Sequence, residues 1–207
     1  MPRGPYTIEL LADDLIALLD RLDVERAHLV GLSLGGMVAI SVAAERPDRV
    51  ASLALLATSA HLGPEQMWID RAHTARTQGM AVLGGSVVER WFTPRFRAEQ
   101  RDEVAAMQKM VESTPAEGYA AACEAIRHMD LRERLASIMA PTIAIAGAED
   151  PVTTPEHLRL IADAIPGARL EIVDGAAHLL NVEEQGPVTA LLLEHLSDAE
   201  EAASAGR

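Results

Sequence analysis

Residues 27–45, AHLVGLSLGGMVAISVAAE, are the most informative part of this sequence about its fold. The stretch opens with a short apolar run, passes through the pattern GLSLG at 31–35, and continues as a helical pattern that stops before Pro47. This order predicts a buried strand, a tight turn and a helix. A serine on such a turn, here Ser33, sits in a strained backbone conformation with its hydroxyl held above the sheet, and the flanking glycines leave space where a Cβ would collide.

The segments around this stretch predict more strands and helices in alternation. Aliphatic runs at 52–58, 141–147 and 168–174 predict three further strands. Helical patterns lie at 7–22, with Thr7 as the expected N-cap, and at about 155–164. Alternating helices and fully apolar strands predict an α/β fold, with a parallel sheet covered on both faces. The expected buried face of the first helix consists of Ile8, Leu11, Leu15, Leu18, Leu19 and Leu22.

Residues 62–139 interrupt this alternation, because they contain several helical patterns and no convincing strand. An all-helical insertion between two strands of a parallel sheet predicts a lid. We therefore divide the chain into a core at 1–61 and 140–197, a helical lid at 62–139 and a tail at 198–207. The tail lacks large apolar side chains and is expected to be disordered.

Composition excludes several classes of partner. The chain has 207 residues and a formal net charge of −13, which repels polyphosphate and argues against nucleic-acid binding. No apolar run approaches the roughly 18 to 20 residues that span a bilayer, and the N-terminus lacks the apolar core of a signal peptide. The sole cysteine, Cys123, can form no intramolecular disulfide. We expect a soluble cytoplasmic protein that binds neither nucleic acid nor membrane.

Two further residues complete a candidate catalytic triad with Ser33. Asp150 follows the predicted strand at 141–147, and His178 follows the one at 168–174, so all three should meet at the carboxyl edge of the sheet. Serine is a poor nucleophile unless an imidazole takes its proton and a carboxylate orients that imidazole. An aspartate before a proline is also a common turn former, and the neighbouring Glu149 competes for the role of the acid.

The same turn supplies an oxyanion donor, and no cofactor is expected. The helix after Ser33 points its N-terminal N–H groups at the site, so the backbone N–H of Leu34 is expected to stabilise an oxyanion. The sequence contains no HExxH pattern, no GxGxxG pattern and no P-loop. We therefore predict a hydrolase that uses neither a metal nor a cofactor.

With these residues the chain resembles the α/β-hydrolase fold family, and within it the 3-oxoadipate enol-lactonases of the β-ketoadipate pathway, which belongs to the catabolism of aromatic compounds. The elbow around Ser33 and the loops of Asp150 and His178 are shared by the whole family. The lid stretches WFTP at 91–94 and GYAAACEAIR at 118–127 resemble the lactonases more narrowly. The other similar stretches are GPYTIELLADDLIALLDRL, RAHLVGLSLGGMVA, PTIAIAGAEDPVTTPEH and AAHLLNVE.

The resemblance implies hydrolysis of an enol-lactone to 3-oxoadipate through an acyl-enzyme on Ser33. The substrate carries a carboxylate, and a cation in the lid is needed to bind it in an acidic protein. Arg71 and Arg127 are the candidates for that cation, although a lid arginine is more often a solvated surface group. Trp68, Trp91 and Met37 are expected to wall the pocket, or else to pack in the core.

The chain also departs from that family. Relatives begin with further strands and with a His-Gly loop that provides a second oxyanion N–H, whereas here Met1 falls just before the helix at 7–22. The resemblance therefore implies a sheet truncated at its N-terminal strands, with residues 27–32 as an exposed apolar edge that is open to self-association. Two alternatives stay open: a hydrolase of another ester or of a carbon–carbon bond, and an inactive truncated fragment.

Overall fold

A computed structural model describes residues 4–205 and contains one four-stranded sheet. All neighbouring strands are parallel, and the order is β1-β2-β3-β4. The strands are β1 (Ala27–Leu32), β2 (Val50–Leu56), β3 (Thr142–Gly147) and β4 (Arg169–Val173). The predicted α/β fold with a parallel sheet is confirmed.

Pairing brings the carboxyl ends of the strands to a common edge. Leu32 pairs with Leu56 in the ladder of β1 and β2, and Gly147 pairs with Val173 in the ladder of β3 and β4. Strand β3 is buried along its whole length, as its uninterrupted aliphatic sequence requires. The loops that follow β1, β3 and β4 therefore leave the sheet on the same side.

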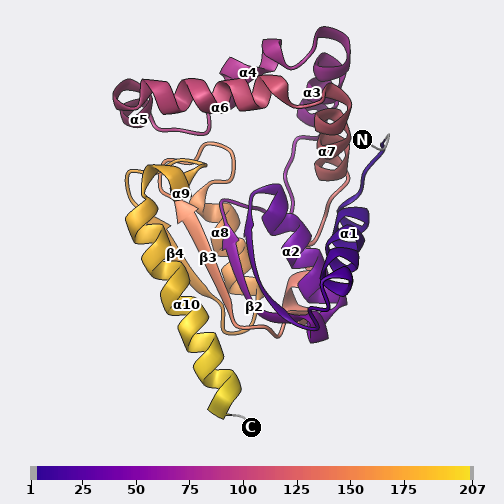
Figure 1. Cartoon of the computed structure of the whole chain (residues 1–207), viewed down its shortest axis with the longest axis vertical. Coiled ribbons are helices and arrows are strands. Elements are labelled where there is room, and N and C mark those ends of the chain that lie inside the picture. Colours follow the sequence, from indigo (N-terminus) through magenta and orange to yellow (C-terminus); the bar gives the residue numbers. More distant parts are fainter. Residues whose placement is uncertain (1–3, 206–207) are drawn as a thin grey trace.

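Helices cover both faces of the sheet (Figure 1). Helices α2 (Leu34–Glu45) and α8 (Pro155–Ala164) pack on one face, and α1 (Ile8–Arg21) packs on α2. The long helix α10 (Gln185–Ala205) covers the other face, preceded by the short α9 (Leu180–Glu183). No helix within residues 4–205 is long and apolar enough to cross a membrane.

Helix α1 begins as predicted, and its buried face matches the prediction except at Leu18 and Leu22. Thr7 caps it, because its hydroxyl accepts a hydrogen bond from the N–H of Leu10 at 3.1 Å. Leu18 and Leu22, expected in the core, are 51% and 61% exposed. Ile8 and Leu19 are buried as predicted, Leu11 and Leu15 are partly buried, and Ala12 and Ile16 complete the buried stripe next to α2. Small alanine and β-branched isoleucine allow the close approach to α2, which leaves Leu18 and Leu22 at the flank of the contact.

Five helices between β2 and β3 lie across the carboxyl edge of the sheet (Figure 1). The predicted helical insertion at 62–139 thus contains helices and no named strand, although its separation from the core as a unit stays a prediction. Arg76 joins two of its helices by hydrogen bonds to Glu117 and Glu124. The helices are α3 (Glu65–Gln78), α4 (Ala81–Val88), α5 (Pro94–Glu99), α6 (Arg101–Ser113) and α7 (Ala116–Arg127), and short 3₁₀ turns lie at Pro47–Arg49 and Arg132–Ser137.

The C-terminal stretch differs from the prediction. Residues 198–205 continue α10 as a helix, where a disordered tail was expected, and 206–207 lie outside the described residues. Alanine and glutamate are strong helix formers, and Ala199 is 95% buried against the body of the protein. The absence of large apolar side chains therefore did not exclude a helix.

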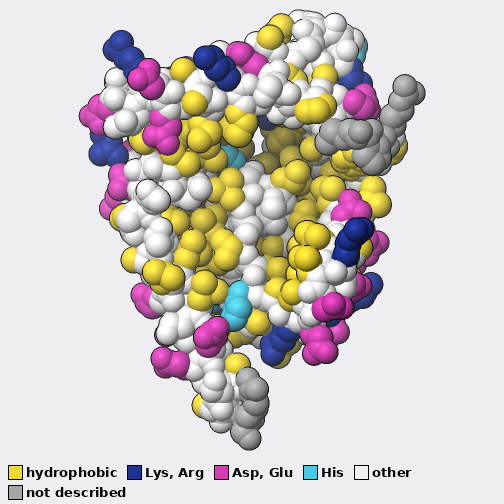
Figure 2. All heavy atoms as spheres, in the orientation of Figure 1, with side chains coloured by type: hydrophobic (Ala, Val, Ile, Leu, Met, Phe, Trp, Pro, Cys, Tyr) yellow, Lys and Arg dark blue, Asp and Glu magenta, His cyan; other side chains and the backbone are white. Residues whose placement is uncertain are grey.

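Strand β1 forms one edge of the sheet, as expected. Within the described residues it pairs with β2 alone, and its Val30 side chain is 51% exposed. Hydrophobic side chains are visible across this side of the molecule (Figure 2). Pairing of this edge with a second copy stays a prediction.

Candidate active site

Ser33 occupies the sharp turn between β1 and α2. Its φ angle is 53°, a left-handed conformation that is rare for residues other than glycine. A Cβ on Gly31 would lie 2.4 Å from the carbonyl oxygen of Gly35, whereas a Cβ on Gly35 would meet nothing within 4 Å. The turn thus requires glycine at 31, where any side chain would collide with the backbone of Gly35. Position 35 itself has space for a side chain.

Hydrogen bonds hold the strained turn in place. The N–H of Ser33 donates to the carbonyl of Leu56 at 2.9 Å, and the hydroxyl of Thr58 donates to the carbonyl of Ser33 at 2.7 Å. Leu34 is the first residue of α2, so its N–H precedes the helical hydrogen-bond ladder. That N–H is oriented by the helix and available to an anion at the site.

Asp150 and His178 form a buried pair. His178 Nδ1 lies 2.8 Å from Asp150 Oδ2, and the two residues are 4% and 3% exposed. The Thr153 hydroxyl donates to the same carboxylate oxygen at 2.7 Å, while the N–H groups of Val152 and Thr153 donate to the other oxygen. With Nδ1 engaged by the carboxylate, Nε2 is the nitrogen left to exchange a proton.

The pKa of Asp150 is lowered despite its burial. Burial alone would raise the pKa of this carboxyl, but hydrogen bonds and charge from His178, with further hydrogen bonds from Thr153 and Val152, outweigh it. The carboxylate is therefore ionised at neutral pH. An ionised aspartate at this position stabilises an imidazolium on His178.

A cavity of about 260 Å³ lies between the sheet edge and the lid. Ser33, Leu34 and His178 line its floor, and most other lining side chains are apolar. Ser33 Oγ forms no hydrogen bond with another residue in the range 4–205, a common situation for catalytic groups without a ligand. The lid and loop contribute Leu62, Trp68, Arg71, Val87, Arg90, Trp91, Tyr119, Ala122, Cys123, Ile126 and Val152.

Three of the five predicted substrate-binding residues line this cavity. They are Trp68, Arg71 and Trp91. The Arg71 guanidinium lies over the Trp68 ring, 5.3 Å from its centroid, and forms no ion pair with any residue that the structure describes. It is therefore a cation at the cavity wall whose charge is not neutralised by a carboxylate.

The other two residues lie elsewhere. Met37 is fully buried in the hydrophobic core, one helical turn after Ser33, and does not line the cavity. Arg127 ends α7 outside the cavity and pairs with Glu65 at 2.6 Å. In both cases the alternative that the sequence left open, core packing for Met37 and a surface position for Arg127, is what the structure has.

Sequence reasoning missed other lining residues, among them Arg90, Tyr119 and Cys123. Cys123 carries a second potential nucleophile, but burial raises the pKa of its thiol to about 11. The thiol is thus protonated at neutral pH and weakly nucleophilic. The lid motifs that contain these residues were visible in the sequence, but helical periodicity alone did not reveal which side chains face the cavity.

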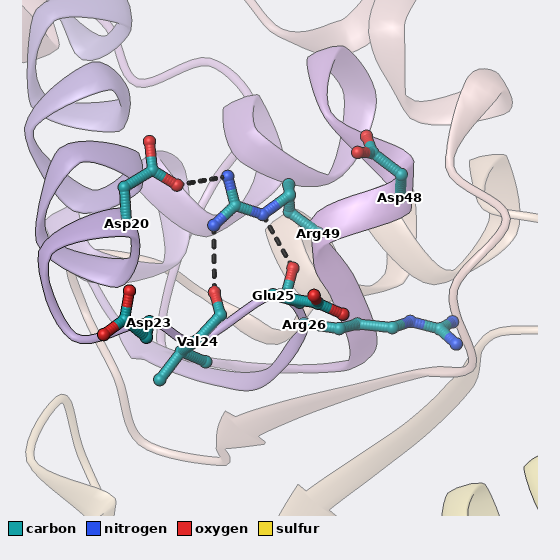
Figure 3. A pocket seen from close by; sticks show the side chains of 7 residues that line it. All are labelled: Asp20, Asp23, Val24, Glu25, Arg26, Asp48 and Arg49. Carbon is teal, nitrogen blue, oxygen red and sulfur yellow. Dashed lines mark hydrogen bonds and ion pairs between the residues drawn. The ribbon is translucent and has the colours of Figure 1, made fainter.

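A second, more open hollow lies at the amino ends of the strands (Figure 3). Its two arginines are already bound: Arg49 reaches Asp20 at 2.7 Å and the carbonyls of Val24 and Glu25, and Arg26 donates to the carbonyl of Val50. Within residues 4–205, no group of three or more histidine, cysteine, aspartate or glutamate side chains is placed so that it could hold a metal ion. The hollow is lined by Asp20, Asp23, Val24, Glu25, Arg26, Asp48 and Arg49.

A strained serine follows β1, and a buried His-Asp pair lies at the ends of β3 and β4. This fold and this arrangement of residues are typical of an α/β-hydrolase, and comparison with known sequences gives the same family. The sequence pattern of the alpha/beta hydrolase family matches residues 2–191, and the chain belongs to that family.

Among its relatives are enol-lactonases. The 3-oxoadipate enol-lactonase 2 of Acinetobacter baylyi is 37% identical over 183 residues, which cover 88% of this chain and 68% of the relative. The crystal structure of the enol-lactonase from Burkholderia xenovorans LB400 matches with a TM-score of 0.92 at 38% identity, over 95% of this chain and 75% of that one. A thermophilic esterase from Thermogutta terrifontis matches with a TM-score of 0.91 at 27% identity, over 96% of this chain and 75% of its own. The chain spans about two thirds of the length of the curated lactonases it matches.

Proposed function

We propose that this chain is a serine hydrolase that opens an enol-lactone to 3-oxoadipate, with Ser33 as nucleophile, His178 as base and Asp150 as its acid partner. The observation that carries the proposal is the buried His178–Asp150 pair, 2.8 Å apart, whose imidazole lines the same cavity as the strained Ser33. Identity of 37% to an enol-lactonase supports the choice of reaction.

The proposed reaction passes through an acyl-enzyme. Ser33 Oγ attacks the lactone carbonyl carbon while His178 Nε2 takes the hydroxyl proton, and the Leu34 N–H stabilises the oxyanion. The ring C–O bond breaks, and the departing enolate oxygen receives the proton from His178 and becomes a ketone on tautomerisation. Water then gives a proton to His178 and its hydroxide to the acyl carbon. The bond between that carbon and Ser33 Oγ breaks, His178 returns the proton to Oγ, and the carboxylic acid that is released ionises to the second carboxylate.

Arg71 is proposed to bind the carboxylate that the lactone carries. Its guanidinium lines the cavity without a carboxylate partner among the described residues, and stacking on Trp68 limits its conformations. Apolar walls beside the cation of Arg71 suit a small ring with one charged group, and Arg90 adds a second positive charge to the cavity lining. Arg127, already paired with Glu65, is not proposed for this role.

Turnover of the enol-lactone compared with p-nitrophenyl acetate tests this proposal. We expect a higher kcat/KM for the lactone, and the loss of both activities in Ser33→Ala. A second candidate, a hydrolase of simple esters, is favoured by the similarity to the thermophilic esterase. Equal or better turnover of the neutral ester would support that candidate, and lactone turnover that survives Ser33→Ala would exclude the proposed mechanism.

A further inference from the structure

The lid segment at 91–95 is hydrogen bonded to the loop that carries His178. The N–H of Leu179 donates to the carbonyl of Trp91 at 2.9 Å. Beside it, Glu183 Oε1 accepts from both the N–H and the hydroxyl of Thr93, each at 2.8 Å. The residue after the proposed base and the lid residue that lines the cavity are therefore joined through the backbone.

The same carboxylate also holds the residue before the base. Glu183 Oε2 accepts from the N–H of Ala177 at 2.5 Å, and Ala177 precedes His178. One half-buried glutamate thus uses one oxygen on the lid and the other on the histidine loop. Hydrogen bonds to an ionised acceptor are roughly twice as strong as neutral ones, which suits a carboxylate that receives three donors.

The opposite side of this loop is fixed by the loop of Asp150. The N–H of Glu149 donates to the carbonyl of Ala176 at 2.9 Å. A Cβ on Gly147 would lie 2.2 Å from the carbonyl oxygen of Ala177, so the two loops touch where glycine stands. The backbone that aims His178 is therefore held between the Asp150 loop on one side and Glu183 on the other.

We infer that Glu183 is a positioning residue for His178, and that it links the lid to the proposed base. The inference rests on the proposed function for the identity of the base and extends it to a residue that does not line the cavity. Segment 91–95 and the histidine loop consequently move as one body. A substrate that contacts Trp91 would then also contact the unit that holds the imidazole of His178 in position.

The variant Glu183→Gln tests this inference at nearly constant shape. An amide has one acceptor oxygen, so its NH₂ group must face either Ala177 or Thr93, both of which present donors. We expect the rate of labelling by a fluorophosphonate probe, and kcat for p-nitrophenyl acetate, to fall about 10- to 100-fold, since small misplacements of a catalytic group have effects of this size. KM should stay near the wild-type value, and the pH profile of labelling should shift.

Glu184→Gln is the matched control. It removes the same charge one residue along, from a carboxylate that pairs with Arg95 at 2.8 Å, an exposed side chain that also donates to the carbonyl of Gly175 at 3.2 Å. Because these contacts are solvent-exposed and Glu183 keeps its three hydrogen bonds, labelling should stay unchanged. Thr93→Ser keeps both donors to Glu183 and should retain the rate, whereas Thr93→Val should reduce it.

A readout besides activity separates this inference from the proposed function. Amide hydrogen exchange of Ala177 should accelerate in Glu183→Gln and not in Glu184→Gln, whether or not the chain reacts with the probe. An unlabelled wild-type chain would contradict the proposed function alone. Wild-type labelling rate, pH profile and Ala177 exchange in a folded Glu183→Gln protein would overturn the inference. Faster exchange throughout the chain would also overturn it, because the role would then be general stability.

Discussion

The two hollows of this molecule differ in what their polar groups do. The open one around Arg49 measures about 650 Å³, and the one beneath the lid about 260 Å³. In the larger hollow Arg49 is bound by Asp20, Val24 and Glu25, whereas in the smaller one Arg71 has no carboxylate partner among the described residues. Neither the volume of a hollow nor the presence of charged residues in its lining shows which of the two is the candidate active site. What distinguishes the smaller hollow is an arginine without a carboxylate partner among the described residues, beside a histidine that an aspartate orients.

Among variants that keep the proposed nucleophile and base, the largest effect we predict comes from the acid of the proposed triad. Asp150→Asn should lower the acylation rate of Ser33 by about 10,000-fold, because the amide favours the wrong tautomer of His178. The measurement is single-turnover labelling with a fluorophosphonate probe. Glu149→Gln is the control, since sequence alone left Glu149 as a competitor. A similar loss in both variants would mean that the local loop, rather than the His178 contact, accounts for the effect.

Arg71 should determine how tightly substrates that carry a carboxylate bind. Arg71→Met should raise KM for the carboxylate-bearing lactone about 10- to 100-fold, as expected for loss of a charged hydrogen bond of about 1.5–3 kcal/mol. Hydrolysis of neutral p-nitrophenyl acetate should change little. Arg127→Met removes an equal charge from a surface pair and should leave both values alone. If the two variants had the same effect on KM, the proposed difference between Arg71 and Arg127, which pairs with Glu65, would be wrong.

The larger hollow should matter for stability alone. Arg49→Ala removes an ion pair and two backbone contacts from a largely buried side chain and should lower the free energy of unfolding by about 1–3 kcal/mol. Urea denaturation measures this change, and labelling per folded molecule should be unchanged. Arg26→Ala, which removes one hydrogen bond to Val50, should cost less. A specific loss of activity in Arg49→Ala would make this hollow functional.

The smallest effect concerns His195, a buried histidine with an unpartnered Nε2 that lies outside both hollows. Burial, with Arg169 and His28 nearby, lowers its pKa from the ordinary value of 6.5, against weaker opposing effects of Asp198 and of a hydrogen bond to the backbone of Leu53. The unfolded chain thus takes up the proton first, so this contribution to stability is complete above that pH and is lost as the pH falls below it. His195→Leu should weaken the fall in urea midpoint between about pH 7 and pH 5. An unchanged pH dependence would contradict this.

Much of the fold follows from local sequence. Aliphatic runs bounded by glycine or proline predicted β3 and β4 to within a residue or two, and Pro155–Ala164 is a helix as expected. Where prediction failed, the decisive contact was tertiary. The buried face of α1 is chosen by its fit against α2, and residues 198–205 stay helical with Ala199 packed against the body.

The candidate active site was also predicted only in part from the sequence. The strand ends placed His178 and Asp150 together, because parallel strands deliver their loops to one edge. Sequence could not tell that Arg71 faces the cavity while Arg127 faces Glu65, since the position of a residue on a lid helix does not show which side of that helix meets the cavity. Glu183 was overlooked because its three hydrogen bonds join segments far apart in the chain.

Covalent labelling of the purified 207-residue chain with a fluorophosphonate probe tests the central claim most directly. We predict stoichiometric labelling of Ser33 that is abolished in Ser33→Ala and lost in His178→Ala. A folded chain that the probe does not modify, or one that it modifies equally in Ser33→Ala, would contradict the assignment of Ser33, His178 and Asp150 as a working triad.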